Sequence, residues 1–94
     1  MSMKPVVWID YMTFRAQQRG FDLAELETVI RYATERYFDT QTLRHIVIGR
    51  CGDALVLIAY DENDVAITPV TPVTVHAVTR PQITMRVQTG RFVL

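Results

Sequence analysis

Residues 43–60 read LRHIVIGRCGDALVLIAY, and the pair of strands that this stretch predicts decides the fold. Its first part, Leu43–Arg50, is predicted to be a strand, whose side chains point alternately to the two faces. Positions 46 and 48 then share one face and positions 45 and 47 share the other. The residues between the two strands, Cys51-Gly52-Asp53, have the composition of a hairpin turn. Residues 54–60 are apolar throughout, which is typical of a central strand covered on both faces.

Two helices are expected before this hairpin. The first is predicted over residues 11–19, with Asp10 as its N-cap, after a short strand at residues 6–9. The second begins after Asp22, because Glu25 completes a capping-box arrangement and an apolar stripe follows at residues 23, 26, 30 and 33. After residue 34 the spacing of the apolar residues changes from the helical period of 3.6 to a period of two, which predicts a strand over residues 35–38. The polar residues 39–41 that follow are expected to form a turn.

The chain after the hairpin predicts a turn at residues 61–64, an extended segment over residues 65–78 and then a short helix. Pro69 and Pro72 cannot donate ladder hydrogen bonds, so residues 69–72 are expected at a sheet edge, a bulge or a loop. Alternation then points residues 73, 75 and 77 inward and residues 74, 76 and 78 to the opposite face. A second capping-box pair, Thr79 with Gln82, favours a helix over residues 80–89, although residues 83, 85 and 87 also alternate like a strand.

These elements together predict a single α+β domain over residues 1–94. An N-terminal strand and two helices pack on an antiparallel sheet, and a short helix follows at the C-terminal end. The hydrophobic share of 49% with 21% charged residues is that of a globular chain and excludes disorder. The longest apolar run, residues 54–60, is far shorter than the ~20 residues of a membrane span, and no signal peptide is evident.

The remaining composition predicts a cytoplasmic protein without a cofactor or metal. A single cysteine, Cys51, cannot form an internal disulfide, which suits a reducing compartment. One cysteine and two histidines at unrelated spacings do not make a zinc site. The 4 glycines stand alone, so no glycine-rich phosphate loop is present and a nucleotide cofactor is not expected.

The net charge of zero conceals an asymmetry along the chain. Residues 65–94 carry three arginines and His76 and contain no acidic residue. Such a segment predicts a local basic surface, which either binds phosphate groups or is simply a solvated helix face.

His76 is the first candidate for chemistry, because it lies four residues before Arg80 in this basic segment. An imidazole can transfer protons near neutral pH, and a guanidinium can hold a phosphate by two parallel hydrogen bonds. His76, Arg80 and Arg86 are therefore the predicted catalytic set, and they are expected on one accessible surface. The alternative is a structural histidine that bonds to a neighbouring strand or helix end.

A second group of residues is predicted to bind nucleic acid: Arg44, Arg50, Tyr60 and Arg91. The alternative for the strand arginines is an ordinary role as sheet-edge charges. The alternative for the tyrosine is a core ring with its hydroxyl at the rim. Five other aromatic residues are not interleaved with basic residues in sequence and are interpreted as core or interface: Trp8, Tyr11, Phe14, Tyr37 and Phe38.

Three stretches carry a resemblance to a known family: RAQQRGFD at residues 15–22, RHIVIGR at residues 44–50, and TVHAVTRPQI at residues 74–83 with Arg86, Thr89, Gly90, Arg91 and Phe92. With its order of elements, the chain resembles the RelE/BrnT-like toxins of bacterial toxin–antitoxin pairs. It looks most like a branch of small bacterial domains of unknown function, and the resemblance extends over most of residues 8–92.

The resemblance implies a metal-independent endoribonuclease that binds RNA, often ribosome-associated mRNA, and is neutralised by an antitoxin protein. It points to His76, Arg80 and Arg86 as the site, with Arg44, Arg50 and Tyr60 behind them. Such toxins are commonly strongly basic, whereas this chain has a net charge of zero. The neutral charge favours a second hypothesis, a non-catalytic protein-interaction module of the same fold that forms a homodimer through an apolar sheet face.

Overall fold

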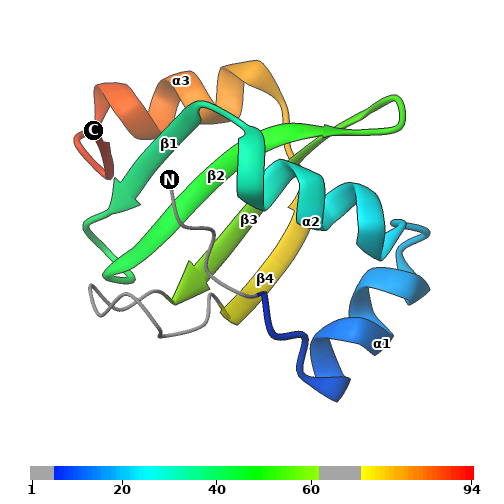
Figure 1. Cartoon of the computed structure of the whole chain (residues 1–94). Helices are drawn as coiled ribbons and strands as arrows, with labels where there is room; N and C mark the ends of the chain where they lie inside the picture. Colours follow the sequence, from blue (N-terminus) through cyan, green and yellow to red (C-terminus); the bar gives the residue numbers. More distant parts are fainter. Residues whose placement is uncertain (1–5, 62–70) are drawn as a thin grey trace.

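The computed structural model describes residues 6–61 and 71–94. Three helices and five strands follow one another as α1 (Asp10–Gln18), α2 (Leu23–Tyr32), β1 (Glu35–Asp39), β2 (Arg44–Cys51), β3 (Ala54–Asp61), β4 (Thr71–Ala77), α3 (Arg80–Gln88) and β5 (Phe92–Val93). The strands form one antiparallel sheet in the order β4-β3-β2-β1-β5 (Figure 1). The predicted α+β class is therefore confirmed.

The sheet carries a separate apolar cluster on each face. The first includes residues of α1 and α2 and consists of Met12, Ala16, Leu26, Val29, Ile30, Val47, Cys51, Val56, Ile58, Tyr60 and Val75. The second includes Ile83 of α3 and consists of Ile46, Ile48, Leu57, Ala59, Val78, Ile83 and Phe92. Strand β3 contributes to both clusters, which explains why residues 54–60 are apolar at every position and confirms its central place.

Helix α2 begins where the sequence predicts and lies close against β2. The carboxylate of Asp22 accepts hydrogen bonds from the backbone N–H groups of Ala24 at 2.8 Å and Glu25 at 3.4 Å, which confirms the N-cap. Gly49 of β2 allows the helix to approach, because a Cβ atom there would lie 2.6 Å from Cγ1 of Val29. The close contact fixes α2 over the first face of the sheet.

The prediction for the N-terminal segment is wrong in two respects. Residues 6–9 do not form a strand: Val6 makes only an isolated bridge, and the segment packs Val6 and Trp8 onto the first cluster instead of joining a ladder. The indole Nε1 of Trp8 also donates to Glu27 of α2 at 3.3 Å. Asp10 is the first residue of α1 and Ile9 is the N-cap, with no side-chain capping bond.

Strand β4 forms one edge of the sheet, as Pro72 requires. The pairing of β3 with β4 shifts register between Ala59 and Tyr60, and Tyr60 is the residue that pairs with Pro72. Pro72 therefore lies both in an edge strand and beside a β-bulge. Val75 is buried as predicted, but Ala77 is exposed, because it ends an edge strand that has a neighbouring strand on one side only. Pro69 and most of the turn predicted at residues 61–64 lie outside the described residues.

The C-terminal part contains the predicted helix and one strand that the sequence does not predict. Thr79 and Gln82 form the complete capping box of α3. Strand β5 then pairs Phe92 with Asp39 of β1, and the buried ring of Phe92 stacks on Tyr37 with ring centroids 5.6 Å apart. A strand of two residues is too short to show a period of two, so it leaves no pattern in the sequence.

Among the described residues, no helix has the length and apolar character that crossing a membrane requires.

Candidate functional site

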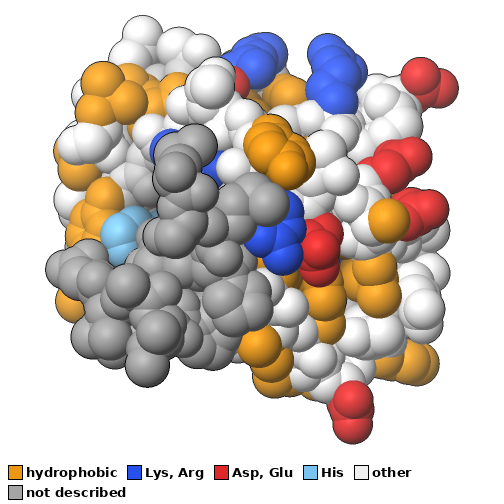
Figure 2. All heavy atoms as spheres, viewed as in Figure 1, with side chains coloured by type: hydrophobic (Ala, Val, Ile, Leu, Met, Phe, Trp, Pro, Cys, Tyr) orange, Lys and Arg blue, Asp and Glu red, His pale blue; other side chains and the backbone are white. Residues whose placement is uncertain are grey.

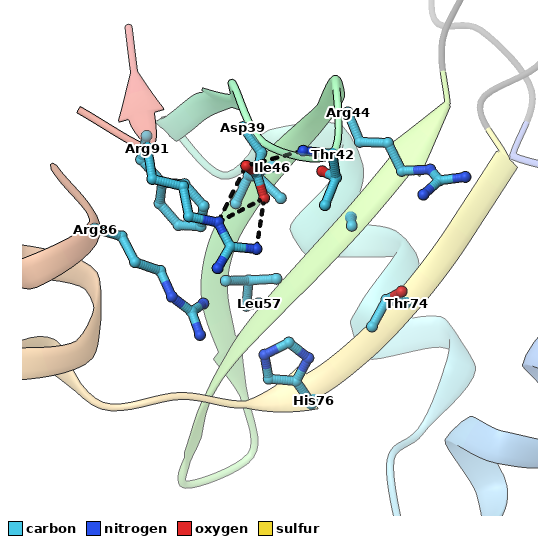
Figure 3. A pocket seen from close by; sticks show the side chains of 11 residues that line it. Asp39, Thr42, Arg44, Ile46, Leu57, Thr74, His76, Arg86 and Arg91 are labelled. Carbon is cyan, nitrogen blue, oxygen red and sulfur yellow. Dashed lines mark hydrogen bonds and ion pairs between the residues drawn. The ribbon is translucent and has the colours of Figure 1, made fainter. Parts of the chain in front are cut away.

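A hollow of about 120 Å³ opens on the α3 side of the sheet, near the end where β5 joins β1 (Figure 3). Every strand, the β1–β2 turn and α3 contribute to it, and the residues that line it are Asp39, Thr42, Arg44, Ile46, Leu57, Ala59, Thr74, His76, Arg86, Arg91 and Phe92. Three arginines and one aspartate belong to this lining. Arg91 pairs with Asp39 and Arg44 pairs with Asp61, so the excess positive charge of the hollow comes from Arg86.

The carboxylate of Asp39 holds the end of the chain against β1. Arg91 donates from Nε to both carboxylate oxygens, at 3.1 Å and 3.2 Å, and from Nη2 to Oδ2 at 3.0 Å. The backbone N–H groups of Gln41 and Thr42 donate to Oδ1 at 2.9 Å and 3.3 Å. Burial of Asp39 opposes its ionisation, but these hydrogen bonds outweigh it and lower the pKa of the carboxyl below its ordinary value.

The ring of Phe92 makes cation–π contacts with two guanidinium groups. The Cζ atom of Arg86 lies 5.5 Å from the ring centroid, and that of Arg91 lies 5.9 Å away. The ring itself is buried and stacked on Tyr37, so its position is fixed by the core. No carboxylate in the described part of the chain pairs with Arg86. Its guanidinium is held at the hollow by an aromatic ring and keeps its hydrogen-bond donors for a ligand.

The imidazole of His76 faces Arg86 across the hollow. Figure 3 shows the His76 side chain rising from β4 and the Arg86 side chain descending from α3 toward the same space. Burial lowers the pKa of His76 below its ordinary value, and the charges of Arg86 and Arg19 lower it further. The lowered pKa favours the neutral form of the imidazole, which can accept a proton.

Arg44 lines the hollow, but its charged end is directed elsewhere. Its Nε donates to Asp61 Oδ1 at 3.2 Å, and Figure 3 shows the guanidinium pointing away from Arg86 and Arg91. Arg44 thus contributes positive electrostatic potential at the rim of the hollow, and its guanidinium is not placed to contact a ligand at the centre.

The other three predicted residues lie outside the hollow. Arg80 is bound to Glu35 at 2.7 Å near the start of α3, and Arg50 donates to the carbonyl of Asp53 in the β2–β3 hairpin. Tyr60 is buried on the opposite face of the sheet, where its hydroxyl accepts a hydrogen bond from Arg36 at 3.0 Å. The structure brings together His76, Arg86, Arg91 and the stem of Arg44, and separates them from Arg80, Arg50 and Tyr60.

Sequence reasoning missed Asp39, Thr42, Thr74 and Phe92 as lining residues. One local signal existed: an aspartate that ends a strand before a turn often accepts hydrogen bonds from the following backbone N–H groups, as Asp39 does. The absence of acidic residues after residue 65 also meant that any counterion of Arg91 had to come from an earlier element.

The opposite face has a different charge distribution. Figure 2 shows the face that carries α2, where acidic side chains gather toward the start of that helix. Within residues 6–61 and 71–94, no group of three or more His, Cys, Asp or Glu side chains is arranged to hold a metal ion. Because it contains the Arg86 guanidinium, the hollow on the α3 side is the candidate anion site.

No protein-family model matches the sequence, and no curated protein or solved structure matches it significantly.

Proposed function

We propose that this chain is a toxin-like RNA-binding protein of the RelE/BrnT type. The hollow is its active site and cleaves RNA without a metal ion, and an antitoxin protein neutralises the toxin by binding to it. One observation carries the proposal: a partly buried imidazole faces a guanidinium that has no acidic partner among the described residues. This pair combines a proton acceptor with a phosphate-binding group.

The chemistry that suits this pair begins with a phosphodiester held by the Arg86 guanidinium. The neutral His76 imidazole takes the proton of the adjacent 2′-hydroxyl, whose oxygen then forms a bond to phosphorus. The bond from phosphorus to the 5′ oxygen breaks, that oxygen takes a proton from water, and a 2′,3′-cyclic phosphate forms. The hydroxide that remains takes the proton from the His76 imidazolium, which restores the neutral imidazole. Arg86 stabilises the added negative charge in the transition state, and DNA is not cleaved because it lacks the 2′-hydroxyl.

The alternative function, a homodimeric interaction module that binds through an apolar sheet face, receives less support. Most large apolar residues of β2 and β3 are buried in the two clusters on the described part of the chain. An apolar partner surface would then come mainly from the helices, the connecting segments and β5, where exposed apolar side chains lie.

The test uses purified protein and a long single-stranded RNA at low salt, alone and with translating ribosomes. His76→Ala should bind RNA nearly as the parent does and lose about 10²–10⁴-fold in cleavage rate. Arg86→Ala should weaken binding and make it less dependent on salt concentration. The variant neutralises one RNA phosphate fewer, so fewer counterions are released when the complex forms. Arg50→Ala is the matched control, since it removes the same charge from the hairpin outside the hollow.

EDTA should leave cleavage unchanged, and the matching DNA should bind without being cut. If the parent neither binds nor cleaves RNA in either setting, the proposed function is wrong. If Arg50→Ala weakens binding as much as Arg86→Ala, the attraction is general and the hollow is not the site.

A further inference from the structure

Helix α1 carries a row of aromatic and basic side chains on its outer surface. Tyr11 and Arg15 are four residues apart and lie along one side of the helix, Phe14 lies beside Tyr11, and Arg19 directly follows the last residue of the helix. The buried residues of α1, Met12 and Ala16, occupy a different side. The row is therefore not part of the core.

The two rings of this row are exposed although they are large and apolar. Tyr11 is 64% exposed and Phe14 is 61% exposed. The Cζ atom of Arg15 lies 5.9 Å from the centroid of the Tyr11 ring, which leaves the other face of that ring open. Of the two roles expected for these aromatics, core or interface, their exposure excludes the core, and Arg15 lies over one of the two rings.

The row leads to the edge of the sheet that carries His76. Arg19, just after α1, donates from Nη1 to the backbone carbonyl of Val75, the residue before His76 in β4. Its charge also acts on His76. Helix α1 packs on β4, and Figure 3 shows the blue helix beyond that strand, on the far side from the hollow. A chain that leaves the hollow over the β4 edge meets Arg19 first, then Arg15 and Tyr11.

We propose that the row Tyr11–Phe14–Arg15–Arg19 continues the hollow as a track for single-stranded RNA. Bases stack on the rings of Tyr11 and Phe14, and the two guanidinium groups hold the phosphates between them. A combination of stacking aromatic rings with cations is the chemistry by which proteins bind single strands without regard to sequence. The inference rests on the proposed function, because it names the form of RNA that the same site takes.

Charge and length both fit this occupant. The only acidic residue of α1 is Asp10 at its start, and no carboxylate in the described ranges pairs with Arg15 or Arg19. Eight residues of helix separate Tyr11 from Arg19, a rise of about 12 Å. At about 3.4 Å for each stacked nucleotide, the row spans three to four nucleotides. A duplex would not bind in this way, since its bases are already stacked and paired.

The experiment measures fluorescence anisotropy with labelled oligouridylates of three and twelve nucleotides that carry 2′-O-methyl groups and so resist cleavage. The parent should bind the twelve-nucleotide probe more tightly than the three-nucleotide probe. Tyr11→Ala and Phe14→Ala should each weaken binding of the longer probe by about 5-fold to 100-fold, and should leave nearly unaffected the shorter probe, which binds through a phosphate at the hollow. Tyr32→Ala is the matched control, because Tyr32 is also 64% exposed but lies at the end of α2.

Thermal melts would confirm that the exposed substitutions leave the fold intact, and Tyr11→Leu retains apolar area while removing the ring. If Arg86→Ala weakens binding and the α1 variants behave like Tyr32→Ala, the track is wrong and the proposed function stands. If the parent binds neither probe, both are wrong. A change from dimer to monomer in Tyr11→Ala, with unchanged RNA affinity, would show that the row contacts a second copy and would overturn the track.

Discussion

Replacement of Asp39 by alanine should destabilise the protein far more than its position beside a turn suggests. The side chain is 3% exposed and accepts three hydrogen bonds from Arg91 and two from backbone N–H groups. Removal of one partner of a buried ion pair costs about 3–5 kcal/mol. The Arg91 side chain is 34% exposed and regains water, so we expect a loss of about 3 kcal/mol in the free energy of unfolding, at the lower end of that range.

The assay is thermal unfolding at pH 7 followed by circular dichroism. A loss of about 3 kcal/mol corresponds to a fall in Tm of about 12–24 °C for a domain of this size. Asp61→Ala is the control, because it breaks an ion pair with Arg44 whose aspartate is 60% exposed, and such pairs contribute about 0–1 kcal/mol. Asp39→Asn keeps an oxygen for the two N–H donors while losing the charge, and should fall between the two.

The dependence on pH gives a second readout. The pKa of Asp39 is lowered in the folded protein, so its ionised form contributes stability that is fully present above about pH 5 and is lost as the pH falls through the folded-state pKa. The difference in Tm between the parent and Asp39→Asn should therefore shrink between pH 5 and pH 2. Equal Tm values for Asp39→Ala and Asp61→Ala at pH 7, or a difference independent of pH, would refute the reasoning.

Two further measurements concern His76 and Gly49. The imidazole of His76 should titrate by NMR below its ordinary midpoint of about 6.5, and Arg86→Ala should raise that midpoint by removing a positive charge. Because the unfolded chain binds this proton more readily than the folded chain, the free energy of unfolding should fall as the pH drops through that range, and it should fall less in His76→Gln. If Arg86→Ala leaves the NMR midpoint of His76 unchanged, the proposed proximity of the two side chains is wrong. Gly49→Ala should destabilise the fold by about 1–3 kcal/mol through contact with Val29, and the added change Val29→Ala should recover part of that loss; two independent costs that simply add would contradict the close approach of α2.

The parts of the fold that the sequence predicts correctly depend on residues close together in the chain. Asp22 and Thr79 cap helices through residues two or three positions later, and the alternation at residues 44–51 follows from the strand itself. Residues 6–9 were mistaken for a strand because their composition is that of a strand, whereas packing of Trp8 on α2 decides their conformation.

The candidate site was predicted only in part because its geometry depends on distant elements. Sequence spacing placed His76 and Arg86 in one basic segment, and the structure brings them to one hollow. Spacing alone could not show that Glu35 engages Arg80, or that Tyr60 contacts Arg36 on the other face. These partners lie 24 to 45 positions away along the chain, where no local pattern connects them.

The contact between Asp39 and Arg91 joins positions 52 residues apart. A ribosome adds about 5–20 residues per second, so the N-terminal helices and the β2–β3 hairpin are synthesised seconds before Arg91 and Phe92. Phe92 positions Arg86, and Arg91 secures β5 to β1, so the hollow is completed only after these two residues are free to dock. A nascent chain whose Arg91 and Phe92 have not yet emerged from the ribosome thus lacks the assembled hollow and cannot bind a ligand there.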